Sequence, residues 1–243
     1  MSSDSAIKIQ ALVRGFNFRN KKLLEPCNIS EIGMNVLKLQ RTLKDEYLTS
    51  SRMEYCKSTA TGNLILEDGY MEFLTAKSMD AVRVGEGHCP VDIVKDEKGI
   101  DVACVCLNGK QTNEKSIMQN FSTCGNNLDN LFENGKHQEA LSVYVKEYYK
   151  KLLDAKKTKK LSKLYYCVFI STDINVYMSV FKINLECILN IKYVNITKQN
   201  KSIKFKGFID DKFGTTTLFK SKKRLEIRLN EAILNCYNTI KLV

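Results

Sequence analysis

Asp92 and Asp101 are the residues of this sequence whose types and spacing best suit chemistry. Each is the single acid within a short apolar run, Pro90–Val94 and Ile100–Leu107, and the charged stretch Lys95–Gly99 joins the two runs. Short β-branched runs joined by a Gly-containing loop are typical of a β-hairpin. A carboxylate half-buried in a sheet is costly unless a cation compensates it, and a divalent metal ion is the usual compensation. We therefore predict a metal site on this hairpin, with Asp92 and Asp101 as its ligands.

The rest of the chain is basic. Its net charge is +11 and its pI is about 9.1, which favours a polyanionic partner such as nucleic acid. Nine cysteines without regular spacing, and an N-terminus without a secretory apolar core, predict reduced thiols and an intracellular location in the cytoplasm or nucleus. The sequence has no run of 18 apolar residues, so we expect no membrane span. Hydrophobic residues make up 44% of the chain, which argues against global disorder.

Two clusters of cations are candidates for contacts with DNA phosphates. The densest is Lys220, Lys222, Lys223 and Arg224, and a second includes Lys159 and Lys160. Such clusters bind a phosphate backbone through counterion release. The alternative is a solvated face of a lysine-rich protein.

The elements that must position these residues follow from the hydrophobic periodicity. Helices are predicted over residues 28–60, 64–81 (interrupted or begun near Gly69), 113–121 and 136–154, the last followed by a basic loop over 156–160. Strands are predicted over residues 164–171, 176–183, 188–197, 203–209, 216–219 and 225–229, and a short closing helix over 231–240. This order predicts an α/β fold, with α+β as the alternative, built on a mixed central β-sheet flanked by helices. We expect one domain over residues 25–243, with the hairpin at 88–107, after an N-terminal segment 1–24.

The N-terminal segment is a basic amphipathic sequence over residues 5–24. Ile9-Gln10, Arg14-Gly15 and Arg19 have the spacing IQxxxRGxxxR, so the segment resembles an IQ motif. The resemblance implies a helix that a calmodulin-like protein grips by its apolar side, with acidic walls meeting the cations. The sequence departs from the pattern at Lys22, where an apolar residue is usual. The alternative is a basic helix that packs on the body of the protein or touches phosphate.

The hairpin and the helix before it resemble the PD-(D/E)XK nuclease superfamily, which includes the type II restriction endonucleases. The matching residues are Glu72 in the predicted helix, Pro90-Val91-Asp92 in the first strand and Asp101 in the second. The resemblance covers residues 64–121 and implies a restriction-endonuclease-like core, with Mg²⁺ held by Asp92 and Asp101 and Glu72 as a further catalytic residue. It also implies a homodimer that cuts both strands of DNA.

The sequence departs from this family at one catalytic position. Ala103 stands two residues after Asp101, where the family has Lys. Either the site is inactive or another cation replaces the lysine. Our candidate is Lys115, with Lys110 next, and Glu114 is a candidate further ligand. The alternative triplet Asp96-Glu97-Lys98 falls in the predicted turn, too close to Asp92 to occupy the second strand.

These observations predict a Mg²⁺-dependent endodeoxyribonuclease that acts site-specifically on double-stranded DNA. The alternative is a basic nucleic-acid-binding or calmodulin-binding protein without catalysis, in which Ala103 marks the absent lysine. A third reading is a viral structural or packaging protein. The IQ-like segment points to a eukaryote or a virus of eukaryotes as the source.

Overall fold

The fold is given by a computed structural model. It describes residues 21–48, 64–84, 89–108, 111–112, 115–116, 125–197, 202–220 and 224–243, and the following concerns these residues. Residues 1–20, which carry the IQ-like motif, lie outside them. So do Lys110, Glu114, Lys222 and Lys223, and the side chains of Lys115 and Arg224 are not described.

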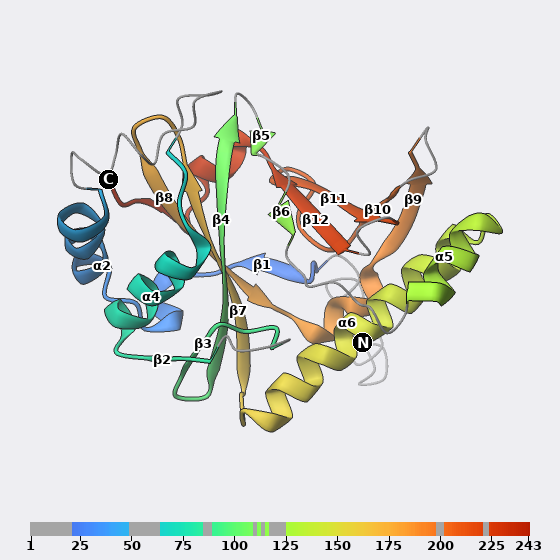
Figure 1. Cartoon of the computed structure of the whole chain (residues 1–243), viewed down its shortest axis with the longest axis horizontal. Coiled ribbons are helices and arrows are strands. Elements are labelled where there is room, and N and C mark those ends of the chain that lie inside the picture. Colours follow the sequence, from blue (N-terminus) through green and yellow to red (C-terminus); the bar gives the residue numbers. More distant parts are fainter. Residues whose placement is uncertain are drawn as a thin grey trace, which may run out of the picture.

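A mixed β-sheet forms the centre of the molecule (Figure 1). Within the described ranges it has eight strands in the order β1-β8-β7-β4-β3-β2, with β13 also beside β8 and β5 beside β4. The strands are β1 Leu24–Pro26, β2 Val82–Arg83, β3 Ile93–Lys95, β4 Lys98–Asn108, β5 Gln111–Thr112, β7 Lys163–Ser171, β8 Val176–Ile183 and β13 Thr239–Lys241. β4 runs parallel to β7, whereas β3 with β4 and β7 with β8 are antiparallel. The predicted α/β fold with a mixed sheet flanked by helices is confirmed.

Helix α6, His137–Thr158, lies between β4 and β7 along the chain and covers one face of the sheet. Its buried side chains recur at helical spacing: Ala140, Leu141, Tyr144, Tyr148, Leu152 and Ala155. The helix predicted over 136–154 is therefore confirmed. It continues through Lys156 and Lys157, which were expected in a loop, because cations in a last turn are favoured by the helix dipole. Helix α5, Gly125–Glu133, precedes it and was not predicted.

Helices α2, Val36–Thr42, and α4, Asp68–Met79, cover the opposite face. Helix α4 confirms the helix predicted to begin near Gly69. The single helix predicted over 28–60 is wrong for its described part, because the chain is divided there. A 3₁₀-helix η1, Ile29–Ile32, ends at Gly33 in the left-handed conformation, and α2 leads into a π-helical turn η2, Leu43–Tyr47.

A second, antiparallel sheet has the order β6-β12-β11-β10-β9 among the described strands. These are β6 Lys115–Ser116, β9 Lys192–Ile196, β10 Ser202–Lys206, β11 Gly214–Phe219 and β12 Arg224–Leu229. The strands predicted in the last third of the chain are confirmed with shifted ends, since residues 185–190 form a 3₁₀-helix, η4. The helix predicted over 113–121 is wrong at β6. The closing helix over 231–240 is reduced to a 3₁₀-helix η5, Glu231–Asn235, followed by β13.

Two apolar cores lie on the two faces of the central sheet. The second sheet packs with α6 on one face, where the Tyr144 hydroxyl accepts a hydrogen bond from the Leu225 backbone N–H at 3.0 Å. The ring of Tyr148 stacks on that of Phe208, with centroids 6.0 Å apart. On the other face α2 and α4 close the second core. Among the described helices, none is long and apolar enough to cross a membrane.

Candidate active site

The predicted hairpin is formed by β3 and β4. The register pairs Ile93 with Ile100 and Lys95 with Lys98, so the turn has only two residues, Asp96 and Glu97. Asp96 takes a left-handed conformation with φ 53°, which aspartate tolerates better than most residues. The predicted loop of four to five residues is therefore too long. The acids of the alternative triplet are exposed at the hairpin tip, away from Asp92.

Asp92 directly precedes β3, at the point where the pairing of β3 with β4 ends. Its backbone N–H still donates to the Ile100 carbonyl at 2.9 Å, and its own carbonyl accepts from the Val84 N–H at 2.7 Å. Beyond Ile100, β4 has no partner residue from β3. There the Asp92 side chain supplies the acceptor, because its Oδ2 accepts a hydrogen bond from the Val102 N–H at 2.7 Å. One partner of Asp92 is thus a backbone amide, so a structural role as the cap of a strand end is an alternative to a catalytic role.

Asp68 accepts a backbone hydrogen bond in the same way, two residues further along β4. It lies in the first turn of α4, and its Oδ1 accepts from the Cys104 backbone N–H at 2.9 Å. Asp68 was missed in the sequence. The available signal was its spacing from Glu72, because residues four apart share one face of a helix.

Asp101 lies on β4 between Ile100 and Val102, the two residues whose backbone groups form hydrogen bonds with Asp92. Its neighbours on the same face of the strand, Ala103 and Val105, belong to the core under α6. Burial raises the pKa of Asp101 well above its usual range, and the charge of Asp92 and a hydrogen bond with the Asp92 carboxyl raise it further. The pKa values of Tyr148 and Tyr166 are raised by burial and then by Asp101, which places both phenols within its electrostatic reach.

Asp92 also has a raised pKa. Burial is the main cause, the Val102 N–H opposes it, and the charges of Glu72 and Asp68 add to it. Glu72 and Asp68 raise the pKa of Asp101 as well. Glu72 itself forms an ion pair with Arg83 of β2, with Oε2 2.9 Å from Nη2.

Four carboxyl groups from three elements therefore meet beside β4; we call Asp68, Glu72, Asp92 and Asp101 the acidic cluster. The structure brings together all three acids that the sequence singled out from α4 and the hairpin. Two carboxyl groups joined by a hydrogen bond hold a proton between them, since like charges at this distance do not both ionise. A divalent cation can take the place of that proton, and oxygen donors alone are what Mg²⁺ prefers. Within the described ranges, no three or more His, Cys, Asp and Glu side chains are already arranged as a metal site.

Lys115, the proposed replacement for the family's lysine, lies outside the β3–β4 hairpin. The backbone of Lys115 is in β6 and pairs with Ile227 of β12, in the second sheet. The position that the family gives to lysine is filled by Ala103, which is 4% exposed in the core. In the described part of the chain, the cation paired with the acidic cluster is Arg83.

The described members of the two cation clusters belong to different elements of the fold. Lys159 and Lys160 are exposed just after α6. Lys220 follows β11 and forms an ion pair with Glu133 of α5 at 3.2 Å. The backbone of Arg224 begins β12 opposite Phe219, so Lys220 and Arg224 flank one hairpin end.

The chain was compared with protein-family models, with curated proteins and with solved structures, and none of these comparisons gave a match.

Proposed function

We propose that the protein is a Mg²⁺-dependent endodeoxyribonuclease whose catalytic centre is the acidic cluster. The observation that carries this proposal is the hydrogen-bonded pair Asp92 and Asp101, half-buried on adjacent stretches of one hairpin, with Glu72 beside it. A helical Glu, a Pro-x-Asp before one strand and an acid on the next are the three pieces of the PD-(D/E)XK resemblance. Their meeting at one place supports the proposal, because residues up to 29 positions apart in the sequence had no need to converge.

Asp92, Asp101 and Glu72 of the acidic cluster each have a task in this proposal. Asp92 and Asp101 would hold the metal ion, and the bound ion lowers the pKa of a water molecule and stabilises charge on the phosphate. The Val102 N–H fixes one oxygen of Asp92 and leaves the other for the ion. The buried phenols of Tyr148 and Tyr166 lie within electrostatic reach of Asp101. Glu72, held by Arg83, adds negative charge that favours a cation.

The attacking water also needs a proton acceptor or an orienting cation. Lys115 remains our candidate for this role, with Glu114 as a further ligand. Lys220, Lys222, Lys223 and Arg224, together with Lys159 and Lys160, would bind the phosphates of double-stranded DNA. The resemblance further implies site-specific cutting by a homodimer.

A second candidate function is nucleic-acid or calmodulin binding without catalysis. The observations that favour it are that Asp92 and Asp68 both accept hydrogen bonds from β4, and that Ala103 replaces the lysine. The two functions differ in what Asp101 does, because among the described residues its carboxyl accepts no backbone hydrogen bond from β4.

The experiment is cleavage of supercoiled plasmid in Mg²⁺ or Mn²⁺ by the wild type, Asp101→Asn and Asp96→Asn. Asp96 is the matched control, because it is an exposed acid in the turn of the same hairpin. We expect Asp101→Asn to lower the cleavage rate on the order of 10²-fold or more, with DNA retention at low salt unchanged. Asp96→Asn should cut like the wild type, and EDTA should stop both. Equal cleavage by Asp101→Asn, or DNA binding by the wild type with no cleavage in either metal, would overturn the nuclease proposal.

A further inference from the structure

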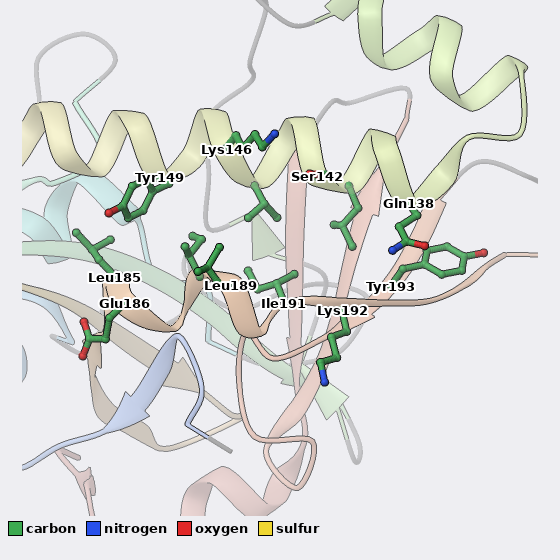
Figure 2. A pocket seen from close by; sticks show the side chains of 13 residues that line it. Gln138, Ser142, Lys146, Tyr149, Leu185, Glu186, Leu189, Ile191, Lys192 and Tyr193 are labelled. Atoms are coloured by element: carbon green, nitrogen blue, oxygen red, sulfur yellow. The ribbon is translucent and has the colours of Figure 1, made fainter. Parts of the chain in front are cut away.

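An apolar groove runs between α6 and the segment that joins β8 to β9 (Figure 2). Its volume is about 780 Å³. One wall carries Leu141, Val145 and Tyr149 of α6, and the other carries Leu189 and Ile191. Leu189 is 85% exposed, and a leucine held in water forgoes about 2 kcal/mol of burial free energy. An apolar groove with an exposed leucine on its wall is a candidate contact site.

The described chain begins beside this groove. The side chain of Asn190, between Leu189 and Ile191 of the groove wall, donates to the Lys21 carbonyl at 2.9 Å. Two residues later the Leu23 carbonyl accepts from the Asn184 N–H at 2.8 Å. Going towards the N-terminus, the chain therefore passes along η4 from Asn184 to Asn190. Lys21, the first described residue, therefore lies near Ile191, at one end of the groove.

The segment that precedes Lys21 has a matching apolar face. Ile9, Leu12, Val13 and Phe16 recur at three- and four-residue spacing, which predicts one apolar side of a helix. From Ile9 to Phe16 such a helix rises about 10 Å, and the α6 wall from Gln138 to Tyr149 is about 17 Å long, so the face fits within the groove. The four residues 17–20 reach about 13 Å when extended, which is enough to lead from Lys21 around Ile191.

We propose that residues 5–20 of this same chain dock in the groove as a helix, with the apolar face on Leu189 and Ile191. Glu186, Lys146 and Lys192 also line the groove, so its charges are mixed and the apolar face carries the docking. Covalent attachment favours this occupant, because a short linker gives an effective concentration on the order of millimolar. The docked face is the one that a calmodulin-like partner would grip, so the groove and such a partner exclude each other. This proposal is independent of the catalytic role of the acidic cluster.

The test is limited trypsin digestion of the full chain, following cleavage after Arg14 by mass spectrometry. Leu189→Asp is compared with Ile174→Asp, an exposed apolar residue (61%) in the β7–β8 turn, away from the groove. We expect Leu189→Asp to speed cleavage after Arg14 at least about fivefold, a shift of roughly 1 kcal/mol in the docking equilibrium. Ile174→Asp should leave the rate unchanged, and neither change should lower the unfolding temperature appreciably, because both side chains are exposed.

A reciprocal pair of variants tests the segment itself. Leu12→Asp places a charge on the apolar face and should expose Arg14 as Leu189→Asp does, whereas Ala11→Asp lies on the opposite side of the helix and should not. Equal cleavage in the wild type and Leu189→Asp would overturn the proposal. So would protection that rises with protein concentration together with a dimer that Leu189→Asp dissociates in light scattering, because the occupant would then be a second copy.

Discussion

The carboxylate of Asp92 accepts a hydrogen bond from the backbone N–H of Val102 at 2.7 Å, on the part of β4 that no longer pairs with β3. Asp68 does the same for Cys104 at 2.9 Å. Two members of the acidic cluster therefore stabilise the sheet, in addition to any catalytic role. Substitution by Asn keeps an acceptor for the amide, whereas Ala removes it, so only the Asn variants separate catalysis from folding.

Asp101→Asn is expected to stabilise the protein at neutral and alkaline pH. The pKa of Asp101 is raised in the folded state, so the folded state binds the proton more tightly than the unfolded state does. Stability of the wild type should therefore fall as pH rises from the ordinary aspartate pKa through the raised one. The variant should gain about 0.5–2 kcal/mol at pH 8 and little at pH 4. Urea unfolding at the two pH values measures this, and a variant less stable than the wild type at pH 8 would contradict it.

Mg²⁺ should stabilise the wild type in a pH-dependent way. The ion and the proton compete for the carboxyl pair of Asp92 and Asp101, so the stabilisation should be present at pH 8 and vanish in acid. At ten times its dissociation constant the ion adds about 1.4 kcal/mol. Thermal unfolding with Mg²⁺ or EDTA measures the effect. Asp96→Asn is expected to keep the shift and Asp101→Asn to lose it; a shift of equal size in both would place the ion elsewhere.

Asp68→Ala should cost more stability than Asp68→Asn. The alanine leaves the Cys104 N–H without its acceptor, and a hydrogen bond to a charged group contributes about 1.5–3 kcal/mol. The asparagine retains a carbonyl oxygen at the same place. Chemical denaturation of the two variants gives the difference, and equal losses would show that the amide finds another acceptor.

Tyr144→Phe should loosen the contact between α6 and the second sheet. It removes the buried hydroxyl that accepts from the Leu225 N–H, and an orphaned buried donor costs about 1–3 kcal/mol. Tyr149→Phe, on the groove side of the same helix, should stay within about 0.5 kcal/mol of the wild type. The comparison uses denaturant midpoints, and equal changes for the two tyrosines would be inconsistent with it.

Gly207→Ala should destabilise more than Gly135→Ala. Both glycines have positive φ, 95° and 71°, so an alanine is strained at either position. At Gly207 a Cβ would also overlap the backbone carbonyl of Asn190, whereas at Gly135 it meets open space. We expect about 3 kcal/mol or more against about 1 kcal/mol, from unfolding curves. Similar values would mean that the segment at Asn190 yields easily.

The parts of the fold that could be predicted from the sequence are those with a strong local period. The apolar face of α6 and the continuous apolar runs of β7 and β8 identify these elements without reference to anything distant. The acids of the hairpin were found because Asp92 and Asp101 interrupt apolar runs. Their convergence with Glu72 was expected only through the family resemblance.

The parts that could not be predicted depend on contacts between distant residues. The helix expected over residues 5–24 is wrong over residues 21–24, because Leu24 begins β1 and pairs with Ile183. β6 likewise exists through its pairing with β12. The role of Asp68 depends on an amide 36 residues away, at Cys104, which no local pattern reveals.

β7 is buried on both of its faces: Tyr166, Val168 and Ile170 lie in the core under α6, and Tyr165, Cys167 and Phe169 in the core under α4. A single strand thus contributes alternate side chains to both cores. Neither layer can separate from the sheet without exposing half of this strand to water. The two layers should therefore unfold together, in one calorimetric transition, and a cavity made on either side of β7 should lower the melting temperature of the whole molecule.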